Sequence, residues 1–210
     1  MVEEFGRANS LLRKGRLQAL LHNNNVVRWD PPPEGWIKII LDGSCNTCTD
    51  TCTCGGVGRD SNSSWCFGFA KDIGICSCLE AKLWGIYEGL VTAWSLRYTR
   101  VLLETDSREA YDTILSRNLW KVGPSVISSI FEILSRQWEA HFSFIRREGN
   151  RVVDTMARLV LPGSLDHHRW MDPPLAVRDI VLIDGSHIVS SDIANTSDMS
   201  SSLQPDYDNP

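Results

Sequence analysis

The pattern of hydrophobic and polar positions predicts three strands soon after residue 36. Large hydrophobic side chains stand at every second position over residues 37–41 (Ile37, Ile39, Leu41) and over residues 65–69 (Trp65, Phe67, Phe69), as in strands. Between them lies a glycine-rich segment, residues 55–60, for which we predict another strand. The polar run 61–64 that follows it supplies a hairpin turn. We therefore expect an antiparallel meander at the start of the folded region.

Helical periodicity and short apolar runs organise the residues that follow. Hydrophobic residues recur every three or four positions in several segments, which predicts amphipathic helices with two further strands between them. The predicted helices cover residues 78–95, 107–115, 126–134 and 150–160, and the strands cover residues 101–103 and 142–145. The order β-β-β-α-β-α-α-β-α predicts an α/β fold in which a five-stranded mixed sheet carries helices on its faces.

Composition divides the chain into three parts. Residues 1–35 read as a leader and a proline-rich linker, because glycines interrupt the helical spacing and three prolines follow at 31–33. Residues 36–162 hold the predicted domain. Residues 163–210 are rich in Ser, Asp and Asn and are expected to be an acidic, mostly disordered tail, with at most one short element over 176–183.

Charge is distributed unevenly along these parts. The chain has a net charge of -5 at pH 7. The predicted domain carries equal numbers of basic and acidic residues, and the acidic excess belongs to the tail. The overall charge therefore neither excludes nor favours a polyanionic partner such as nucleic acid. There is no apolar run of about 18 residues, so no membrane partner is expected.

Cysteines and the amino-terminal segment bear on the compartment. The seven cysteines are an odd number, and charged residues interrupt the first 21 positions, which argues against a secreted disulfide scaffold. We expect an intracellular protein, in nucleus or cytoplasm. The spacing C-x2-C-x3-C-x-C at Cys45, Cys48, Cys52 and Cys54 could supply four thiolates to zinc, but the two pairs are very close together. The alternative is a turn whose composition has drifted towards Cys and Thr.

Four acidic residues stand at special places in the predicted layout. Asp42 and Asp106 follow two strands that are expected to be parallel neighbours, and so to meet at one edge of the sheet. Glu80 and Asp154 lie in the first turns of two predicted helices. Four carboxylates in one cleft would repel one another unless divalent cations balanced their charge, and hard oxygen ligands suit Mg²⁺ or Mn²⁺. Two such ions can activate a water and stabilise a leaving oxygen in phosphodiester hydrolysis.

Each of these acids has an ordinary explanation when it is taken alone. An Asp before a Gly is usually a turn residue, and a Glu in the first turn of a helix usually complements the helix dipole. The order and sequence context of the four acids together favour the hypothesis of a catalytic site more strongly than any single acid does.

Those contexts resemble a known family. The sequence blocks resemble ribonuclease H type 1, and most closely the plant branch of reverse-transcriptase-associated RNase H-like domains. The resemblance runs from about Trp36 to Leu161. It rests on Leu41-Asp42-Gly43-Ser44, Leu79-Glu80-Ala81, Glu104-Thr105-Asp106-Ser107, Arg147-Glu148-Gly149-Asn150, Asp154-Thr155-Met156-Ala157 and the Gly-Gly-Val-x-Arg-Asp run at 55–60.

The resemblance implies a ribonuclease H-like fold and an activity. Asp42, Glu80, Asp106 and Asp154 would hold two Mg²⁺ ions, with Mn²⁺ as a substitute, and the RNA strand of an RNA–DNA hybrid would be cut. The hybrid would be selected by shape and by 2′-hydroxyl contacts. The residues expected at the substrate are Gly43, Ser44, Ser77, Ser107, Arg147, Asn150 and Arg151.

The sequence also departs from the family pattern. Phe144 stands where active members usually carry a loop histidine, and His141 nearby reads as structural. Cys76 and Ser77 replace an asparagine pair that touches the hybrid in many relatives. A long basic handle found in some bacterial members is missing. These departures predict weaker binding or slower turnover.

Three functions are compatible with the sequence. The first is a monomeric, metal-dependent endonuclease acting on RNA–DNA hybrids. The second is a retroelement-derived nucleic-acid-binding module on the same fold, with weak or absent catalysis. A nuclease acting on a different nucleic-acid structure ranks third. Cleavage of a hybrid, as opposed to binding without cleavage, separates the first two.

Overall fold

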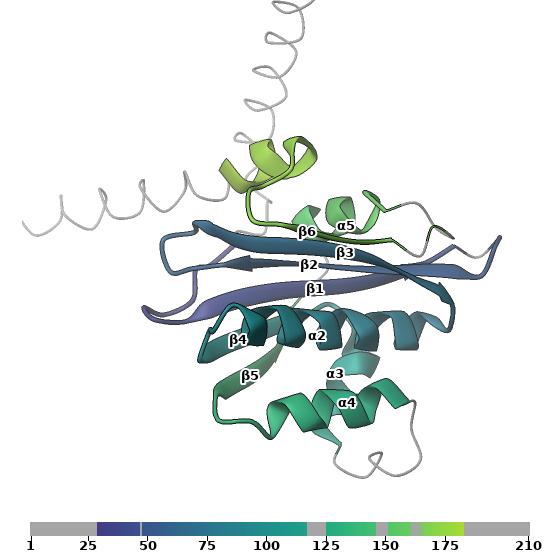
Figure 1. Ribbon diagram of the computed structural model, residues 1–210, viewed down its shortest axis with the longest axis horizontal. Helices are drawn as coiled ribbons and strands as arrows, with labels where there is room; N and C mark the ends of the chain where they lie inside the picture. Colours follow the sequence, from purple (N-terminus) through teal and green to yellow (C-terminus); the bar gives the residue numbers. More distant parts are fainter. Residues whose placement is uncertain are drawn as a thin grey trace, which may run out of the picture.

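A computed structural model describes residues 29–46, 48–116, 125–145, 151–160, 164 and 166–182 (Figure 1). The order of strands and helices agrees with the one predicted from the sequence, with one additional strand at the end. The elements are β1 Ile37–Cys45, β2 Thr51–Arg59, β3 Trp65–Ile75, α2 Cys78–Ser95, β4 Arg100–Thr105, α3 Arg108–Leu115, α4 Ser125–Leu134, β5 Glu139–Phe144, α5 Arg151–Ala157 and β6 His167–Trp170.

The strands form one mixed sheet in the order β5-β4-β1-β2-β3-β6. Strands β1, β2 and β3 pair antiparallel, whereas β4 pairs parallel with both β1 and β5. The mixed α/β sheet predicted from the sequence is therefore confirmed. It has six strands in place of the expected five, because β6 pairs with the outer edge of β3. The segment His-His-Arg-Trp lacks the alternation that marks a strand, so its pairing depends on the neighbouring edge.

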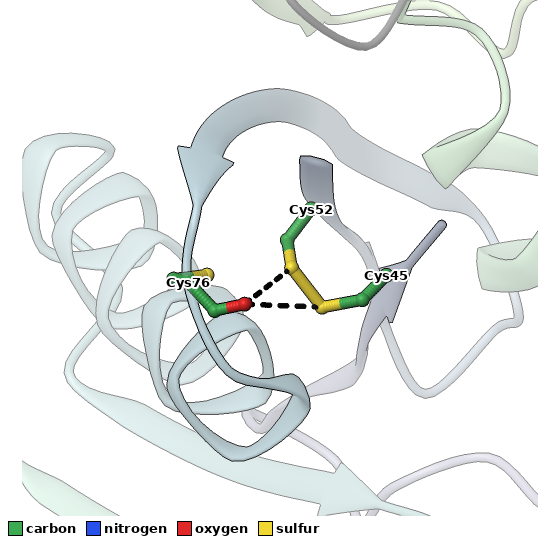
Figure 2. Close-up of side chains that lie close together, drawn as sticks. All are labelled: Cys45, Cys52 and Cys76. Atoms are coloured by element: carbon green, nitrogen blue, oxygen red, sulfur yellow. Dashed lines mark hydrogen bonds between the residues drawn. A yellow bond between two sulfur atoms is a disulfide. The ribbon is translucent and has the colours of Figure 1, made fainter. Parts of the chain in front are cut away.

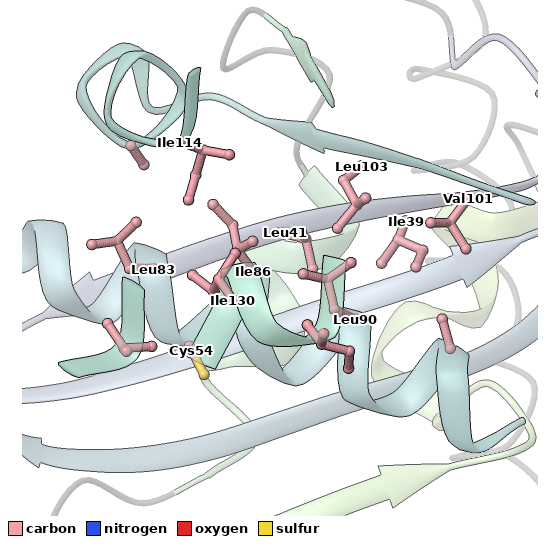
Figure 3. Packing of buried hydrophobic residues seen from close by; sticks show 14 of the residues in the cluster. Ile39, Leu41, Cys54, Leu83, Ile86, Leu90, Val101, Leu103, Ile114 and Ile130 are labelled. Atoms are coloured by element: carbon pink, nitrogen blue, oxygen red, sulfur yellow. The ribbon is translucent and has the colours of Figure 1, made fainter. Parts of the chain in front are cut away.

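Helices cover both faces of this sheet. Helices α2, α3 and α4 lie on one face and α5 lies on the other (Figure 1). Figure 3 shows the larger core, where side chains of α2 meet those of β1 and β4. Its fully buried members include Leu83, Ile86, Leu90, Ile39, Leu41 and Leu103. The smaller core on the opposite face contains Ile40, Val57, Val153 and Met156.

Helix α2 lies unusually close to β1, and two glycines permit this approach. A Cβ at Gly43 would lie 2.4 Å from the carbonyl carbon of Ala81, and one at Gly85 would lie 3.0 Å from the carbonyl oxygen of Asp42. Any side chain at Gly43 would collide with the backbone of α2, which cannot move without repacking the core. This contact brings the first turns of α2 to the part of β1 that carries Asp42.

The packed structure extends beyond both boundaries expected from the sequence. Trp29 is buried in the smaller core together with Val177, which lies on a helix over residues 175–182. The buried guanidinium of Arg59 joins these two segments: it stacks 4.0 Å from the ring centroid of Trp29 and donates a hydrogen bond to the carbonyl of Val181 at 3.2 Å. Residues 29–35 and 166–182 therefore pack onto the sheet. Most of the expected leader, and the tail from residue 183, lie outside the described residues.

Across the helices that the structure describes, none combines the length and the apolar character needed to cross a membrane.

Candidate metal and nucleic-acid site

Three of the four predicted carboxylates line one cavity. Parallel pairing of β1 with β4 ends at Leu41 and Thr105, so the next residues, Asp42 and Asp106, lie side by side at that edge. Asp154 reaches the same place from the first turn of α5. The cavity has a volume of about 360 Å³. Its lining consists of Asp42, Gly43, Ser44, Cys45, Thr53, Cys78, Lys82, Asp106, Asp154, Ala157 and Arg158.

A lysine joins two of these carboxylates. The Nζ of Lys82 lies 2.8 Å from Oδ1 of Asp42 and 3.0 Å from Oδ1 of Asp106, so it donates a hydrogen bond to each. The side chains of Asp42 and Asp106 are only 5% and 4% exposed, and that of Lys82 is 22% exposed. Charge-assisted hydrogen bonds of this length are among the stronger polar contacts in proteins. The ammonium therefore acts as the counter-ion of the two aspartates.

Burial and this ion pair shift the pKa values of both partners. Desolvation raises the pKa of Asp42 to about 6, although the hydrogen bond and the charge of Lys82 oppose the shift. For Lys82, burial acts to lower the pKa, but the hydrogen bonds and charges of Asp42 and Asp106 outweigh it and raise the pKa above its usual value. Lys82 is therefore charged at neutral pH, where Asp42 is mainly ionised.

The structure does not bring Glu80 to the cavity. Its Oε2 accepts hydrogen bonds from the backbone N–H and the hydroxyl of Ser77, at 3.0 and 2.8 Å, while the Ser77 hydroxyl accepts from the Glu80 N–H. This is a capping box at the start of α2, and the bonds from Ser77 lower the pKa of Glu80. Glu80 thus serves the helix terminus, and Lys82, two residues later, takes the place expected for the fourth acid.

The residues predicted to contact the substrate divide into three groups. Gly43 and Ser44 line the cavity, although the close approach of α2 already explains the glycine. Ser77 and Ser107 are the N-caps of α2 and α3, where each side chain accepts a backbone hydrogen bond. Arg147 and Asn150 lie outside the described residues, as does the side chain of Arg151.

Sequence reasoning missed two basic residues that line this cavity, Lys82 and Arg158. The signal for Lys82 was its position three residues after Leu79 and four before Ile86, on the hydrophobic side of the helix. A charged residue at such a position needs a partner of opposite sign, which Asp42 and Asp106 supply.

As they are placed here, the side chains do not fit a pair of divalent ions. An ion bridging Asp42 and Asp106 would occupy the region that holds the Lys82 ammonium, and the two cations would repel each other. With three carboxylates and one ammonium, the cavity has one oxygen donor group fewer and one positive charge more than the predicted quartet.

Phe144, which stands where the loop histidine was expected, packs with neighbouring aromatic and basic side chains. Its ring centroid lies 6.4 Å from that of Tyr111, and the guanidinium of Arg108 lies 5.8 Å from the same ring. The Phe144 side chain remains partly exposed. The ring centroids of His141 and Trp36 lie 5.0 Å apart in an edge-on geometry, so the His141 imidazole packs against an aromatic ring.

The four cysteines considered for zinc do not come together. Cys45 and Cys52 form a disulfide (Figure 2). Cys54 is fully buried in the larger core, where burial raises the pKa of its thiol far above the usual range. Cys48 is exposed in the turn. Of the two alternatives left open for Cys45, Cys48, Cys52 and Cys54, these positions do not support a zinc site formed by all four.

Comparison with known proteins agrees with the fold. Residues 41–160 match the family model described as "Reverse transcriptase-like". A curated relative from Arabidopsis thaliana, named "Putative ribonuclease H protein", is 32% identical over 158 residues; the match spans 74% of this chain and 25% of that protein. The chain therefore corresponds to about a quarter of that relative's length.

Solved structures share the same architecture at low sequence identity. The N-terminal RNase H domain of a Mycobacterium tuberculosis protein superposes with a TM-score of 0.53 and 20% identity, covering 59% of this chain and 91% of that one. RNase H1 of Halobacterium salinarum gives a TM-score of 0.52 at 15% identity, with coverage of 59% and 95%. LC11-RNase H1 in complex with RNA/DNA hybrid gives a TM-score of 0.51 at 18% identity, covering 59% of this chain and 95% of that one.

The strand order, the aspartates at the edge between β1 and β4, and the match over residues 41–160 lead to one assignment. This chain belongs to the reverse transcriptase-like family and carries a plant-type domain of the ribonuclease H fold.

Proposed function

We propose that this domain binds RNA–DNA hybrid at the acidic cavity without hydrolysing it, because Lys82 supplies the positive charge that metal ions would otherwise supply. The observation that carries the proposal is the ammonium of Lys82, 2.8 and 3.0 Å from Asp42 and Asp106. Of the three functions expected from the sequence, this geometry favours the nucleic-acid-binding module.

Charge and ligand type both oppose the binding of two metal ions in this cavity. Mg²⁺ needs oxygen ligands at about 2.1 Å in near-octahedral order. A lysine offers no lone pair when it is protonated, so it cannot replace the carboxylate that the fourth position requires. An ion entering between Asp42 and Asp106 would have to displace Lys82 and break both of its hydrogen bonds. Two-metal hydrolysis would therefore lack the fourth carboxylate ligand, and the region between Asp42 and Asp106 is already filled by the Lys82 ammonium.

The choice of ligand rests on the fold and on the lining of the cavity. LC11-RNase H1, whose structure contains an RNA/DNA hybrid, shares this fold, and we carry that ligand class over as part of the proposal. The cationic groups of Lys82 and Arg158 lie in the same cavity, where they can meet backbone phosphates. Carboxylates beside them would accept hydrogen bonds from 2′-hydroxyl groups, which distinguish the RNA strand.

One observation favours a second candidate, a hybrid nuclease with low activity. Asp42, Asp106 and Asp154 still line one cavity, and Lys82 is long, flexible and partly exposed. Displacement of its head group would leave three carboxylates for metal. This candidate requires that hydrolysis occurs in the unaltered chain and depends on Asp42.

The test compares the unaltered protein with Lys82→Glu and Lys82→Gln on labelled RNA–DNA hybrid, with Mg²⁺, with Mn²⁺ and with chelator. We expect the unaltered chain to bind the hybrid and leave it intact, and Lys82→Glu to cut the RNA strand when metal is present. Lys82→Gln removes the positive charge without adding a carboxylate, so it should not cut. Adding Asp42→Asn to Lys82→Glu should abolish the gained cleavage.

Three outcomes contradict the proposal. Metal-dependent cleavage by the unaltered chain, lost in Asp42→Asn, would establish the second candidate. Failure of the folded, unaltered protein to bind hybrid would remove the proposed ligand. Absence of cleavage by a folded Lys82→Glu variant that binds hybrid would show that Lys82 is not what prevents hydrolysis.

A further inference from the structure

A second group of metal-binding atoms lies beside the cavity. The sulfur atoms of Cys45, Cys52 and Cys76 all lie within 4.8 Å of one another. Figure 2 shows the Cys45–Cys52 disulfide next to Cys76, whose carbonyl oxygen is 3.0 Å from the sulfur of Cys52. None of these three sulfur atoms takes part in the proposed binding of nucleic acid.

Two separate connections of the chain create this cluster. Cys45 and Cys52 are directly opposite each other at the last register position of the β1–β2 pair. Cys76 follows β3, in the connection that leads into α2. Pairing of Thr51 with Ile75 brings the end of β3 beside the start of β2, and this places Cys76 against the disulfide. The sequence spacing alone did not suggest Cys76, because it lies more than twenty residues after Cys52.

A fourth thiol is close by. Cys78 is the first residue of α2, two positions after Cys76, and it is exposed. Cys45 and Cys78 both line the candidate cavity. The β1–β2 hairpin and the start of α2 therefore offer two cysteines each, which matches the four thiolates of an all-cysteine zinc site, although the Cys78 sulfur is not among the three that lie within 4.8 Å of one another.

The sulfur separations suit a soft divalent ion. Zinc lies about 2.3 Å from each thiolate in tetrahedral sites, which sets the thiolates about 3.8 Å apart. Cys45 and Cys52 are bonded to each other, so after reduction their sulfur atoms must separate by rotation about the Cα–Cβ bonds, while Cys76 already lies within 4.8 Å of both. In the oxidised form the disulfide removes two of the ligands.

We propose that, when the Cys45–Cys52 disulfide is reduced, Cys45, Cys52, Cys76 and Cys78 bind one Zn²⁺ ion. A dithiol or phosphine reductant supplies the two electrons that break the S–S bond, and is itself oxidised; the two sulfur atoms take up protons and become thiols. Zn²⁺ then displaces the thiol protons to solvent. The bound ion ties the β1–β2 turn to the start of α2, and so holds in place the helix that carries Lys82.

The test uses the full-length protein, reduced and freed of reductant without oxygen, with Co²⁺ as a spectroscopic probe for the zinc site. We expect one equivalent of Co²⁺ to produce thiolate-to-cobalt charge-transfer absorption, and Zn²⁺ to remove it. Cys76→Ser, Cys45→Ser and Cys78→Ser should each weaken binding at least about tenfold, since each removes one of four ligands. Cys48→Ser and Cys66→Ser are matched controls that should bind as the unaltered protein does. The oxidised protein should show no such absorption.

Several results would overturn the site. One is the absence of charge-transfer absorption in the reduced, folded protein. Another is unchanged affinity in both Cys76→Ser and Cys45→Ser, whose folding is checked by circular dichroism. A loss of binding in Cys48→Ser equal to that in Cys76→Ser would show that the ion is held by the exposed turn and not by this cluster. None of these measurements depends on whether the domain binds or cuts nucleic acid.

Discussion

Lys38 and Lys82 both pair with carboxylates at strands β1 and β4, yet their surroundings differ. The Nζ of Lys38 lies 2.8 Å from Oε1 of Glu104, the two side chains are 8% and 9% exposed, and the Trp29 ring lies over the ammonium at 5.6 Å. Lys82 has two carboxylate partners, greater exposure and an adjoining cavity of about 360 Å³. Lys38 neutralises one buried carboxylate that solvent scarcely reaches. Lys82 lies beside a solvent-accessible cavity in which carboxylates outnumber cationic groups.

This difference separates structural ion pairs from candidate binding sites in the same sheet. A one-to-one pair without access to solvent has no room for a ligand and no excess negative charge to attract a cation. The cavity around Lys82 has both, because Asp154 adds a third carboxylate. Substitutions of Lys38 and Lys82 should therefore lower the free energy of unfolding by different amounts. Only the protein substituted at Lys82 should be stabilised by an added cation.

The largest effect is expected at the closed pair. Lys38→Met leaves Glu104 buried without a partner, so the free energy of unfolding should fall by about 3–5 kcal/mol. The double substitution Lys38→Met with Glu104→Leu should recover most of that loss, because no buried charge remains. Urea denaturation of the three proteins measures both values. A cost below about 1 kcal/mol for Lys38→Met would show that the pair is not closed to water, and the contrast with Lys82 would disappear.

Lys82→Met should cost less, and its effect should be reversed by a divalent cation. Asp42 and Asp106 lose their counter-ion, which should lower the free energy of unfolding by about 1–3 kcal/mol. Mg²⁺ can then occupy the region that the ammonium held and restore about 1–3 kcal/mol when its concentration greatly exceeds the dissociation constant. Urea denaturation with Mg²⁺ or with chelator measures this gain. Equal Mg²⁺ stabilisation of Lys38→Met would contradict a specific role for the cavity.

The pH dependence of stability should identify Asp42. Because burial raises its pKa to about 6 in the folded protein, this carboxyl binds a proton that the unfolded chain, with a pKa near 4, releases. The stability contribution is therefore fully present below about pH 4 and is lost as the pH rises through about 6. Relative to Asp42→Asn, the unaltered protein should lose about 1–2 kcal/mol of unfolding free energy over this range.

Lys82→Met provides the control for this titration. Lys82 opposes the rise in the pKa of Asp42, so its removal should shift the loss of stability to higher pH. If the unaltered protein instead gains stability relative to Asp42→Asn as the pH rises from 4 to 6, the ion pair outweighs burial.

Part of the site could be predicted from the sequence because strand ends are easy to locate. Asp42 and Asp106 each follow a hydrophobic run, and parallel pairing of the two strands brings such residues together whatever the details of the packing. The element order was predictable for a similar reason, since the periodicities of helices and strands are local properties.

The remaining features depend on contacts that no local pattern encodes. A Glu in the first turn of a helix can serve as a metal ligand or as a cap, and Ser77-x-x-Glu80 is also the signature of a capping box. Lys82 was overlooked because a cation is not expected among metal ligands. Strand β6 and the burial of Trp29 arise from the edge of β3 and from Arg59, both distant in sequence.

The smallest effect concerns Glu80, whose two possible roles predict opposite results. Its carboxylate bonds to Ser77 at the start of α2 and does not line the cavity. Glu80→Gln keeps an oxygen that can accept the backbone hydrogen bond but removes the charge at the helix terminus, so unfolding should become easier by only about 0.3–1 kcal/mol. Affinity for RNA–DNA hybrid should not change, and in the Lys82→Glu background the gained cleavage should remain. Loss of that cleavage in Glu80→Gln would show that the Glu80 carboxylate rotates towards the cavity when metal is bound. Glu80 would then be the fourth metal ligand, and Lys82 would only lie next to it.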